Sequence, residues 1–338
     1  MKHVVIPIFI PHKGCPFDCI YCNQKTISGQ KEDVTKEKIK QIIEEHLASI
    51  ENNATVEIGF YGGSFTGIDK TQQIEYLKIA NEYIQNSRIH GIRLSTRPDY
   101  INEEILDYLT LYNVKTIELG VQSLDPEVLI NSCRGHTCED VFRASALIKE
   151  YGMKLGIQTM IGLPGDSREK DIFTAVETIK LAPDLVRIYP TLVIKETYLE
   201  KLFHEDKYHP LSLEMAVDLC AQILKMYRTN GINVIRIGLQ PTDTIQEGMD
   251  VVGGPFHPAF RQLVEARLAF YKMEECIQRN HLLNSKAITI YTGDRNISNV
   301  IGQKKSNLNL LKGKYKFLQI KVITDPALGT DLYIKKEY

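Results

Sequence analysis

The segment GCPFDCIYC, residues 14–22, spaces three cysteines at i, i+4 and i+7, and it follows an apolar run that ends at Ile10. The run Val4–Ile10 is rich in β-branched residues, which predicts a strand. Thiolates are the usual ligands of iron–sulfur clusters, and a cluster of four irons normally takes four of them. Three thiolates would leave one iron open to a small chelating molecule. The segment therefore indicates a metal centre directly after the first strand.

The spacing of these thiols also fits two other kinds of site. His12 together with Cys15, Cys19 and Cys22 offers the donor set of a closed Cys₃His zinc site, because zinc favours sulfur and nitrogen ligands in tetrahedral geometry. Alternatively, the thiols are free and partly buried. A disulfide framework is not expected, because the number of cysteines is odd and no secretion signal is visible.

The composition is that of an ordinary soluble globular protein, with 43% hydrophobic and 25% charged residues. The 41 basic and 42 acidic residues give a net charge of −1, whereas proteins that grip a long nucleic acid usually gather positive charge. Residues 301–338 hold eight lysines and three acids, and a solvated surface is the expected role of this excess. The apolar runs are too short for a membrane span. We expect a cytoplasmic protein without a membrane partner.

Short β-branched runs alternate with amphipathic stretches over the first two thirds of the chain. The expected strands are 4–10, 55–61, 91–96, 116–121, 154–161 and 185–189. The expected helices lie near 35–50, 69–86, 102–112, 137–151, 168–181 and 211–230. Strands joined by helices imply parallel pairing with right-handed connections. About six such units predict a partial α/β barrel with chemistry at the carboxyl ends of its strands, although periodicity does not exclude a doubly wound sheet.

The pattern changes after Gly231. A strand at 233–237 leads into a loop rich in glycine and proline, and a long helix at 259–280 precedes three further apolar runs. We therefore expect a barrel in residues 1–231 and an α+β extension in residues 232–338 that packs on the barrel.

The pattern CxxxCxxC, with an aromatic residue before its last cysteine, resembles the signature of the radical S-adenosylmethionine (SAM) superfamily. The resemblance implies a partial (β/α)6 TIM-like barrel and a [4Fe–4S] cluster held by Cys15, Cys19 and Cys22. It also implies that SAM chelates the open iron and is cleaved reductively to a 5′-deoxyadenosyl radical, which abstracts hydrogen from the substrate. Such chemistry requires an electron donor such as flavodoxin or ferredoxin.

The same resemblance assigns SAM contacts to the ends of the next strands. The segments that carry it are GFYGGSFTG (59–67), LSTRPDY (94–100), IELGVQSLDPEVLINSCRGHT (117–137) and KLGIQTMIGLPG (154–165). In this resemblance Arg134 pairs with the SAM carboxylate, because an arginine fork matches a carboxylate, and Gln158 reaches the ribose hydroxyls. The full set of implied SAM contacts is Tyr21, Gly62, Gly63, Ser64, Ser95, Gln122, Arg134 and Gln158.

Several segments are similar to the Elongator catalytic-subunit family, and the fourth unit also resembles the oxygen-independent coproporphyrinogen oxidases. Larger members of the Elongator family carry an acetyltransferase domain and a basic segment before the barrel. No domain-sized stretch is left here for the first, and 14 residues precede Cys15. Modification of wobble uridine in tRNA is therefore not carried over directly.

A shortened barrel of this kind resembles queuine lyase, which breaks the C–N bond of queuine and releases 7-aminomethyl-7-deazaguanine. We expect a lyase that acts on a small nucleobase-like molecule. One alternative is an Elongator-like enzyme that modifies tRNA or a nucleoside, and another is a non-catalytic zinc-binding interaction module.

Candidate substrate contacts lie at the barrel mouth or in the glycine- and proline-rich loop. They are Asp99, Tyr189, Lys195, Gln240, Glu247, His257 and Arg261. Structural roles compete with these assignments, because Asp99 is equally placed to pair with Arg97 and Tyr189 to pack in the core.

Overall fold

The computed structural model describes residues 3–10, 19–23, 34–51, 53–85, 89–239, 246 and 248–337. The chain divides into two compact units. The first comprises residues 1–212 and 227–256, and the second comprises residues 213–226 and 257–338.

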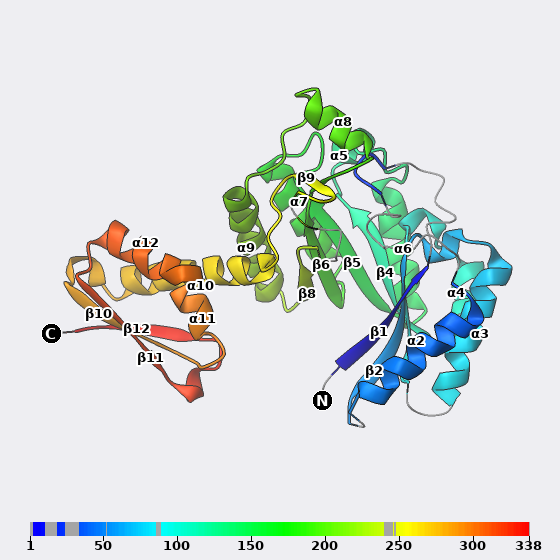
Figure 1. Ribbon diagram of the computed structural model, residues 1–338, viewed down its shortest axis with the longest axis horizontal. Helices are drawn as coiled ribbons and strands as arrows, with labels where there is room; N and C mark the ends of the chain where they lie inside the picture. Colours follow the sequence, from blue (N-terminus) through cyan, green and yellow to red (C-terminus); the bar gives the residue numbers. More distant parts are fainter. Residues whose placement is uncertain are drawn as a thin grey trace. The chain divides into compact units, whose positions relative to one another are not determined.

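A sheet of seven parallel strands forms the centre of the first unit and curls into half of a barrel (Figure 1). The strands lie side by side in chain order: β1 (His3–Ile10), β2 (Thr55–Gly62), β3 (Gly91–Thr96), β4 (Val114–Gln122), β5 (Lys154–Ile161), β6 (Leu185–Pro190) and β8 (Asn233–Ile237). This arrangement confirms the expected α/β partial barrel. The carboxyl ends of all these strands meet at one edge of the sheet.

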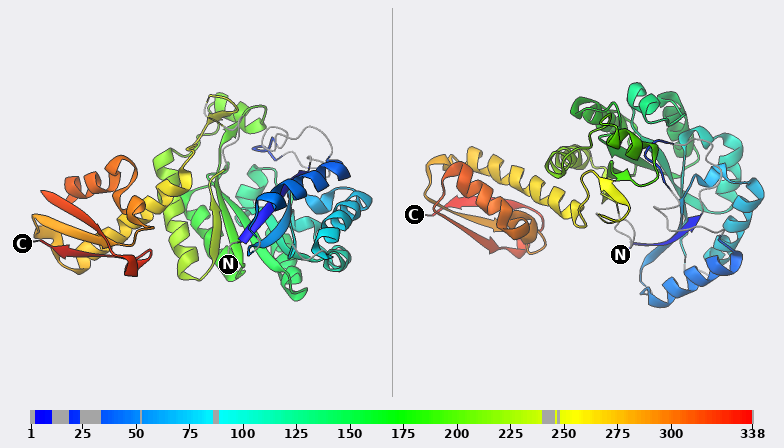
Figure 2. Two further views of the ribbon diagram at one scale, coloured as in Figure 1. Left: turned by 60° about the horizontal axis from the view of Figure 1, so that its bottom comes forward. Right: turned by 45° about the horizontal axis from the view of Figure 1, so that its top comes forward.

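Helices that connect successive strands cover one face of the sheet, here named the outer face (Figures 1 and 2). They are α2 (Lys36–Ser49), α3 (Lys70–Gln85), α4 (Glu103–Leu111), α6 (Cys138–Glu150) and α7 (Arg168–Lys180). Side-chain caps fix where some of these helices begin. At the start of α4, Asn102 accepts a hydrogen bond from the Ile105 backbone nitrogen, and at the start of α6, Thr137 and Asp140 form a capping box. The short helices α5 (Pro126–Asn131) and α8 (Tyr198–His204) and the two-stranded pair β7 (Val193–Ile194) and β9 (Val251–Gly253) lie in the loops.

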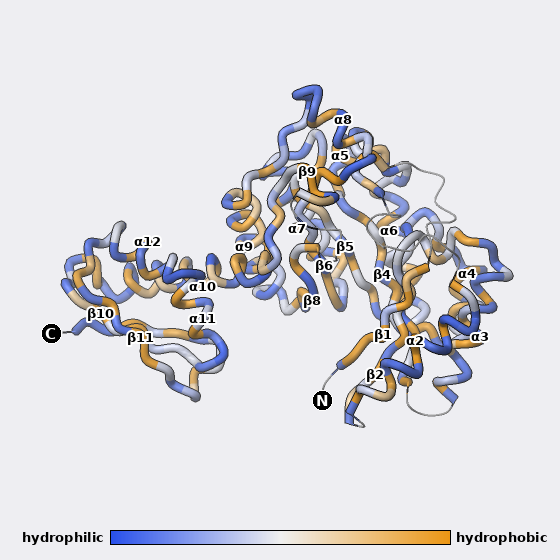
Figure 3. The backbone as a smooth tube through the Cα atoms, in the orientation of Figure 1, coloured by the Kyte–Doolittle hydropathy of each residue, from blue (hydrophilic) through white to orange (hydrophobic). Residues whose placement is uncertain are grey.

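The two faces of the sheet differ in polarity. On the outer face, Ile6, Ile8 and Ile10 of β1 are at most 1% exposed. Figure 3 shows hydrophobic residues along the strands of the sheet. The inner face carries buried charged residues such as Glu118 on β4. A glycine on β5 leaves room for it, because a Cβ atom on Gly156 would lie 2.8 Å from Glu118 Cγ. The hydrophobic core therefore lies outside the sheet, and polar chemistry lies inside it.

The boundary between the two units differs from the one expected at residue 231. Strand β8 pairs in parallel with β6 and is the seventh strand of the barrel sheet, so the sheet is not limited to six strands. The loop up to residue 256 also belongs to the first unit. Helix α9 (Leu213–Thr229) contributes residues to both units. The change in sequence pattern after α9 therefore corresponds to a short edge strand and not to the start of the second unit. That an extension packs on the barrel stays a prediction.

The second unit packs helices on one face of a three-stranded sheet. Its elements are α10 (Phe260–Arg279), β10 (Ala287–Thr292), α11 (Ile297–Ile301), α12 (Ser306–Tyr315), β11 (Gln319–Thr324) and β12 (Leu332–Lys336). The central strand β10 pairs in parallel with β11 and antiparallel with β12. Met273, Ile277, Ile288 and Ile290 are fully buried between the helices and the sheet. This unit therefore has a hydrophobic core of its own.

No helix in the described ranges combines the length and the apolar composition needed to cross a membrane.

Candidate active site

Two of the three motif cysteines lie within the described residues, and Cys15 lies outside them. Cys19 is 5% exposed and Cys22 is half-buried. The Cys22 backbone nitrogen donates to the Cys19 carbonyl oxygen at 2.8 Å, so a tight turn joins the two cysteines. Tyr21 lies between them, and burial raises the pKa of its phenol well above the usual value. The pair lies close to the loop after β4, because the Ile20 nitrogen donates to the Ser132 carbonyl oxygen.

Arg134 brings a buried positive charge to these thiols. Its Nη1 lies 3.1 Å from Cys19 Sγ, and its Nη2 donates to the Gly120 carbonyl oxygen at 2.5 Å. Burial would lower the pKa of Arg134, but the phenol of Tyr21 and the Cys19 thiol raise it above its usual value. Arg97 supports the arrangement, because its Nη2 donates to the Arg134 carbonyl oxygen at 2.6 Å. Arg134 was expected to bind the SAM carboxylate; here it contacts a motif cysteine.

The backbone of Gly62, the last residue of β2, lies very close to that of β1. Gly62 has a φ of +112°, and a Cβ atom there would lie 2.2 Å from the Ile10 carbonyl oxygen. Only glycine therefore fits at the point where β1 and β2 run together into the loop. Ser64 follows, and its hydroxyl shares a hydrogen bond of 2.8 Å with Thr96 and accepts from the Arg97 nitrogen. Gly63 lies between Gly62 and Ser64 in the chain, so the expected SAM-contact segment lies at the carboxyl edge of the sheet.

Gln122 ends β4 in an unusual conformation. Its φ is +70°, and the pairing with β5 shifts register between Gly120 and Gln122. Left-handed backbone is rare for a residue other than glycine and occurs often at functional sites. The Gln122 Oε1 atom is buried and has no hydrogen-bond partner among the described residues. A buried acceptor of this kind is suited to a donor from a bound molecule.

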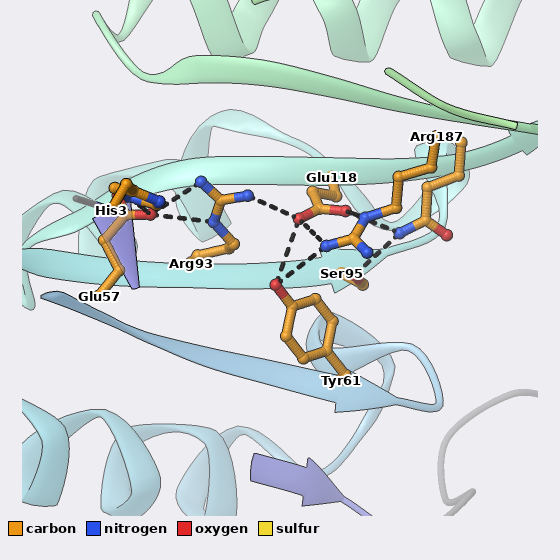
Figure 4. Close-up of polar contacts among 8 residues, drawn as sticks. His3, Glu57, Tyr61, Arg93, Ser95, Glu118 and Arg187 are labelled. Carbon is orange, nitrogen blue, oxygen red and sulfur yellow. Dashed lines mark hydrogen bonds and ion pairs between the residues drawn. The ribbon is translucent and has the colours of Figure 1, made fainter. Parts of the chain in front are cut away.

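A network of buried charges crosses the inner face of the sheet (Figure 4). Glu57 on β2 accepts from Arg93 on β3 at 2.8 and 3.0 Å, and from His3 on β1 at 3.0 Å. Arg93 also reaches Glu118 on β4 at 3.1 Å. Glu118 then binds Arg187 on β6 at 2.5 and 3.0 Å. The two carboxylates are thus shared between two arginines in a chain that links five strands.

Glu118 is the centre of this network and is fully buried. Burial would raise the pKa of Glu118, but the guanidinium groups of Arg187 and Arg93 hold it below its usual value. Tyr61 lies beside it with its hydroxyl 3.4 Å from Glu118 Oε1, and Arg187 lies 5.4 Å above the Tyr61 ring. Burial raises the pKa of Tyr61, which therefore stays protonated at neutral pH.

The network fixes the orientation of Gln158, one of the expected SAM contacts. The Gln158 amide nitrogen donates to Glu118 Oε2 and to Ser95 Oγ, both at 3.1 Å. An ionised carboxylate can only accept, so the amide nitrogen must face Glu118. The amide oxygen of Gln158 therefore points away from Glu118, and the Ser95 hydroxyl keeps its own proton for another acceptor. A ligand with hydroxyl groups could use both.

The expected substrate contacts have different outcomes. Asp99 is bound by Arg97 at 2.9 and 3.0 Å, so the ion pair that the sequence left open is formed. Tyr189 lies on β6 beside the network, where burial raises its pKa. Lys195, which directly follows β7, donates its backbone nitrogen to the carbonyl oxygen of Asp250, which directly precedes β9. Gln240 and Glu247 lie outside the described residues.

The last two expected contacts belong to the second unit. His257 caps the turn before α10 by accepting from the Ala259 nitrogen, and Arg261 lies 3.8 Å from Glu265 on the same helix. Their contribution to a substrate site stays a prediction.

Sequence reasoning missed the charged residues that occupy inner-face positions. They are Glu57, Arg93, Glu118 and Arg187. Each is a charged residue next to apolar residues within a strand, and this was the signal available in the sequence. It also missed His136, which is 4% exposed; burial, with Arg134 and Arg97 nearby, lowers its pKa to about 3. His136 is therefore neutral near pH 7.

Comparison with known proteins gives a consistent result. Residues 9–176 match the family described as "Radical SAM superfamily", and residues 183–269 match the family described as "Radical_SAM C-terminal domain". The chain belongs to the radical SAM superfamily. Enzymes of this superfamily use a [4Fe–4S] cluster and SAM.

Individual relatives place this radical SAM protein near the Elongator branch. It is 30% identical over 258 residues to the tRNA uridine(34) acetyltransferase of Dehalococcoides mccartyi, an alignment that covers 65% of this chain and 56% of the relative. It is 33% identical over 191 residues to Elongator complex protein 3 of Saccharomyces cerevisiae, covering 51% and 34%. The chain thus spans about half or less of these curated relatives. The structure of Methanocaldococcus infernus Elp3 shares the fold, with a TM-score of 0.61 at 21% identity over 83% of this chain and 64% of that one.

The residues present fit the two cofactors of the superfamily. Cys19 and Cys22 lie at the carboxyl edge of the sheet, beside a buried cation that suits anionic ligands. Arg134 Nε and Gln122 Oε1 are buried without partners among the described residues, so a donor and an acceptor are both available. The close backbone approach at Gly62 leaves no room for a side chain. Cys15, Cys19 and Cys22 would hold the cluster, and the loops after β2, β4 and β5 would hold SAM.

Proposed function

We propose that this chain is a radical SAM enzyme that modifies a nucleoside within RNA. The observation that carries the proposal is the similarity of its barrel to curated enzymes whose names state an action on tRNA. The alignments cover 56% of the Dehalococcoides mccartyi enzyme and 34% of yeast Elongator complex protein 3. The proposed reaction is the radical step.

Each part of the site has a distinct task in this proposal. SAM bound to the cluster supplies a radical that removes hydrogen from the substrate. Cys15, Cys19 and Cys22 hold the cluster. The Gly62–Ser64 loop and Gln122 hold the methionine end of SAM. Gln158, oriented by Glu118, accepts a hydrogen bond from a ribose hydroxyl.

The charges of the two units support a polyanionic substrate. The second unit contains 15 lysines and arginines and 9 acidic residues, a net charge of +6, whereas the first contains 26 and 33, a net charge of −7. The net charge of the whole chain is therefore close to zero although the second unit is basic. On its sheet, Lys335 lies 5.3 Å from the ring centre of Tyr333, which stacks on Tyr291 at 4.7 Å. Lysines beside aromatic rings suit phosphate and base contacts in RNA.

Queuine lyase is the more specific expectation, and it remains a separate candidate for the same radical chemistry. It would need polar groups that read the edge of a free base. Of the two carboxylates among the expected substrate contacts, Asp99 is bound by Arg97 and Glu247 lies outside the described residues. The relatives give it no support, and the lyase class is likewise open to test.

The decisive experiment offers both substrates to the same enzyme. The reconstituted chain, SAM and a strong one-electron reductant are incubated without oxygen, with either unmodified tRNA transcripts or free queuine. We expect 5′-deoxyadenosine and a new nucleoside mass with RNA, and RNA binding that weakens steeply with salt. Release of 7-aminomethyl-7-deazaguanine from queuine, with RNA unchanged, would instead establish the lyase.

Two cysteine variants provide the control for this assay. Cys19→Ala removes a proposed cluster ligand and should abolish both iron binding and SAM cleavage. Cys276→Ala changes a half-buried thiol of the second unit and should retain both. Retention of cluster and cleavage by Cys19→Ala would exclude the ligand assignment.

A further inference from the structure

Arg134 points a guanidinium nitrogen at the sulfur of a proposed cluster ligand, with Nη1 at 3.1 Å from Cys19 Sγ. We infer that Arg134 donates a hydrogen bond to this ligand sulfur and thereby raises the reduction potential of the cluster. The inference rests on the proposed function, because it requires the cluster to be present. It differs from the role in SAM binding that sequence resemblance implied.

One contact of the guanidinium and two contacts of the backbone fix Arg134 in this position. Its Nη2 is anchored on the Gly120 carbonyl oxygen, where β4 bulges. The Arg134 nitrogen donates to the Leu129 carbonyl at 3.0 Å, and its carbonyl accepts from Arg97. The preceding residue, Cys133, has a φ of +53°, which turns the chain sharply after α5. Because a guanidinium is planar and rigid, anchoring Nη2 also directs Nη1.

The surroundings make this contact electrostatically strong. Arg134 is 6% exposed and Cys19 is 5% exposed, so water screens the contact only weakly. A ligating cysteine is a thiolate, and hydrogen bonds to ligand sulfurs and nearby charge set the potential of iron–sulfur clusters. A fixed cation stabilises the more negative, reduced cluster over the oxidised one.

The redox step involves one electron and no proton. A low-potential one-electron donor, such as a flavodoxin or a ferredoxin, is oxidised, and the cluster is reduced by the same electron. Arg134 keeps its charge in both states, because a guanidinium group does not lose its proton in proteins. Its effect is therefore on the equilibrium of electron transfer. The guanidinium Nε, which lacks a partner among the described residues, remains available to SAM.

The two roles of Arg134 separate when SAM is left out. The wild-type chain, Arg134→Gln and Arg134→Lys are reconstituted with iron and sulfide, and the midpoint potential is measured by redox titration with EPR detection in the absence of SAM. Arg143→Gln changes an exposed arginine on α6 and serves as the control. Iron and sulfide content is determined for each protein.

We expect Arg134→Gln to lower the potential by about 59 mV, which is a tenfold weaker reduction equilibrium for a one-electron couple. Arg134→Lys keeps the charge and should show a smaller shift, and Arg143→Gln should show none. Unchanged potentials in cluster-loaded variants that bind SAM more weakly would overturn the inference, because Arg134 would then serve SAM alone. Loss of iron from both Arg134 variants would also overturn it, since the residue would then act in cluster retention. A wild-type chain that holds no iron would instead refute the proposed function.

Discussion

The substitution Glu118→Gln tests how much the inner-face network of buried charges contributes to the free energy of unfolding. Glutamine keeps the shape of the side chain and removes its negative charge. Arg93 retains its two hydrogen bonds to Glu57, but Arg187 loses the carboxylate that it contacts at 2.5 and 3.0 Å. The Arg187 side chain is 13% exposed, so its charge would be left largely buried and unpaired.

The size of the effect follows from this geometry. At an effective dielectric constant of 20, a pair of unit charges about 4 Å apart contributes about 4 kcal/mol. Removal of one partner from a buried ion pair typically costs about 3–5 kcal/mol. We therefore expect Glu118→Gln to lower the free energy of unfolding by about 4 kcal/mol. The double variant Glu118→Gln/Arg187→Met should recover more than half of this loss, because it leaves no unpaired charge at this position.

Urea unfolding followed by circular dichroism under anaerobic conditions measures these differences. The matched control is Glu104→Gln, which breaks an exposed ion pair with Lys70 on the protein surface and should have a far smaller effect. Equal losses for Glu118→Gln and Glu104→Gln would refute the reasoning. A double variant as unstable as Glu118→Gln would show that lost packing, rather than an unpaired Arg187, causes the effect.

Two further outcomes are expected. Gly62→Ala should lower the free energy of unfolding by about 3 kcal/mol or more and abolish SAM binding, because the φ of Gly62 is +112° and a Cβ atom there would clash with a backbone oxygen. Gly152→Ala is the control, because a Cβ atom there has no other atom within 4 Å. It should lower the free energy of unfolding by about 1 kcal/mol in the same urea assay. The pKa of His136 is lowered to about 3 in the folded chain, so the unfolded chain takes up a proton at a higher pH than the folded chain does. Stability therefore falls as the pH drops through the usual histidine pKa, and His136 should account for about 2 kcal/mol of the stability lost between pH 7 and pH 5. A His136→Asn variant that loses as much stability as the wild-type chain over this range would contradict the prediction.

The fold was predictable because its signals are local. Each barrel strand is a short β-branched run, and the observed strands agree with the expected ranges to within about two residues. The cysteine spacing and the paired glycines at Gly62 and Gly63 likewise lie within one short segment each. Local patterns of this kind do not depend on the register of the sheet.

The polar network could not be predicted, because register creates it. Glu118 and Arg187 are 69 residues apart and meet only when β5 lies between their strands. The same is true of the orientation of Gln158, which depends on a carboxylate from the neighbouring strand. The observed division differs from the boundary expected after Gly231 for a related reason, since the sequence of a five-residue edge strand does not indicate which sheet it joins.

The strand order leaves β1 and β8 each with a single neighbour in the described sheet, so the cylinder is not closed. In a closed barrel of eight strands, tightly interleaved side chains fill the centre, and a change in one requires changes in the others. Here the apolar layer lies between the sheet and the helices, and the concave face carries buried charged groups such as Glu118. Concave-face positions outside the charge network can therefore change without disturbing the hydrophobic core, so one scaffold of this kind can serve different substrates.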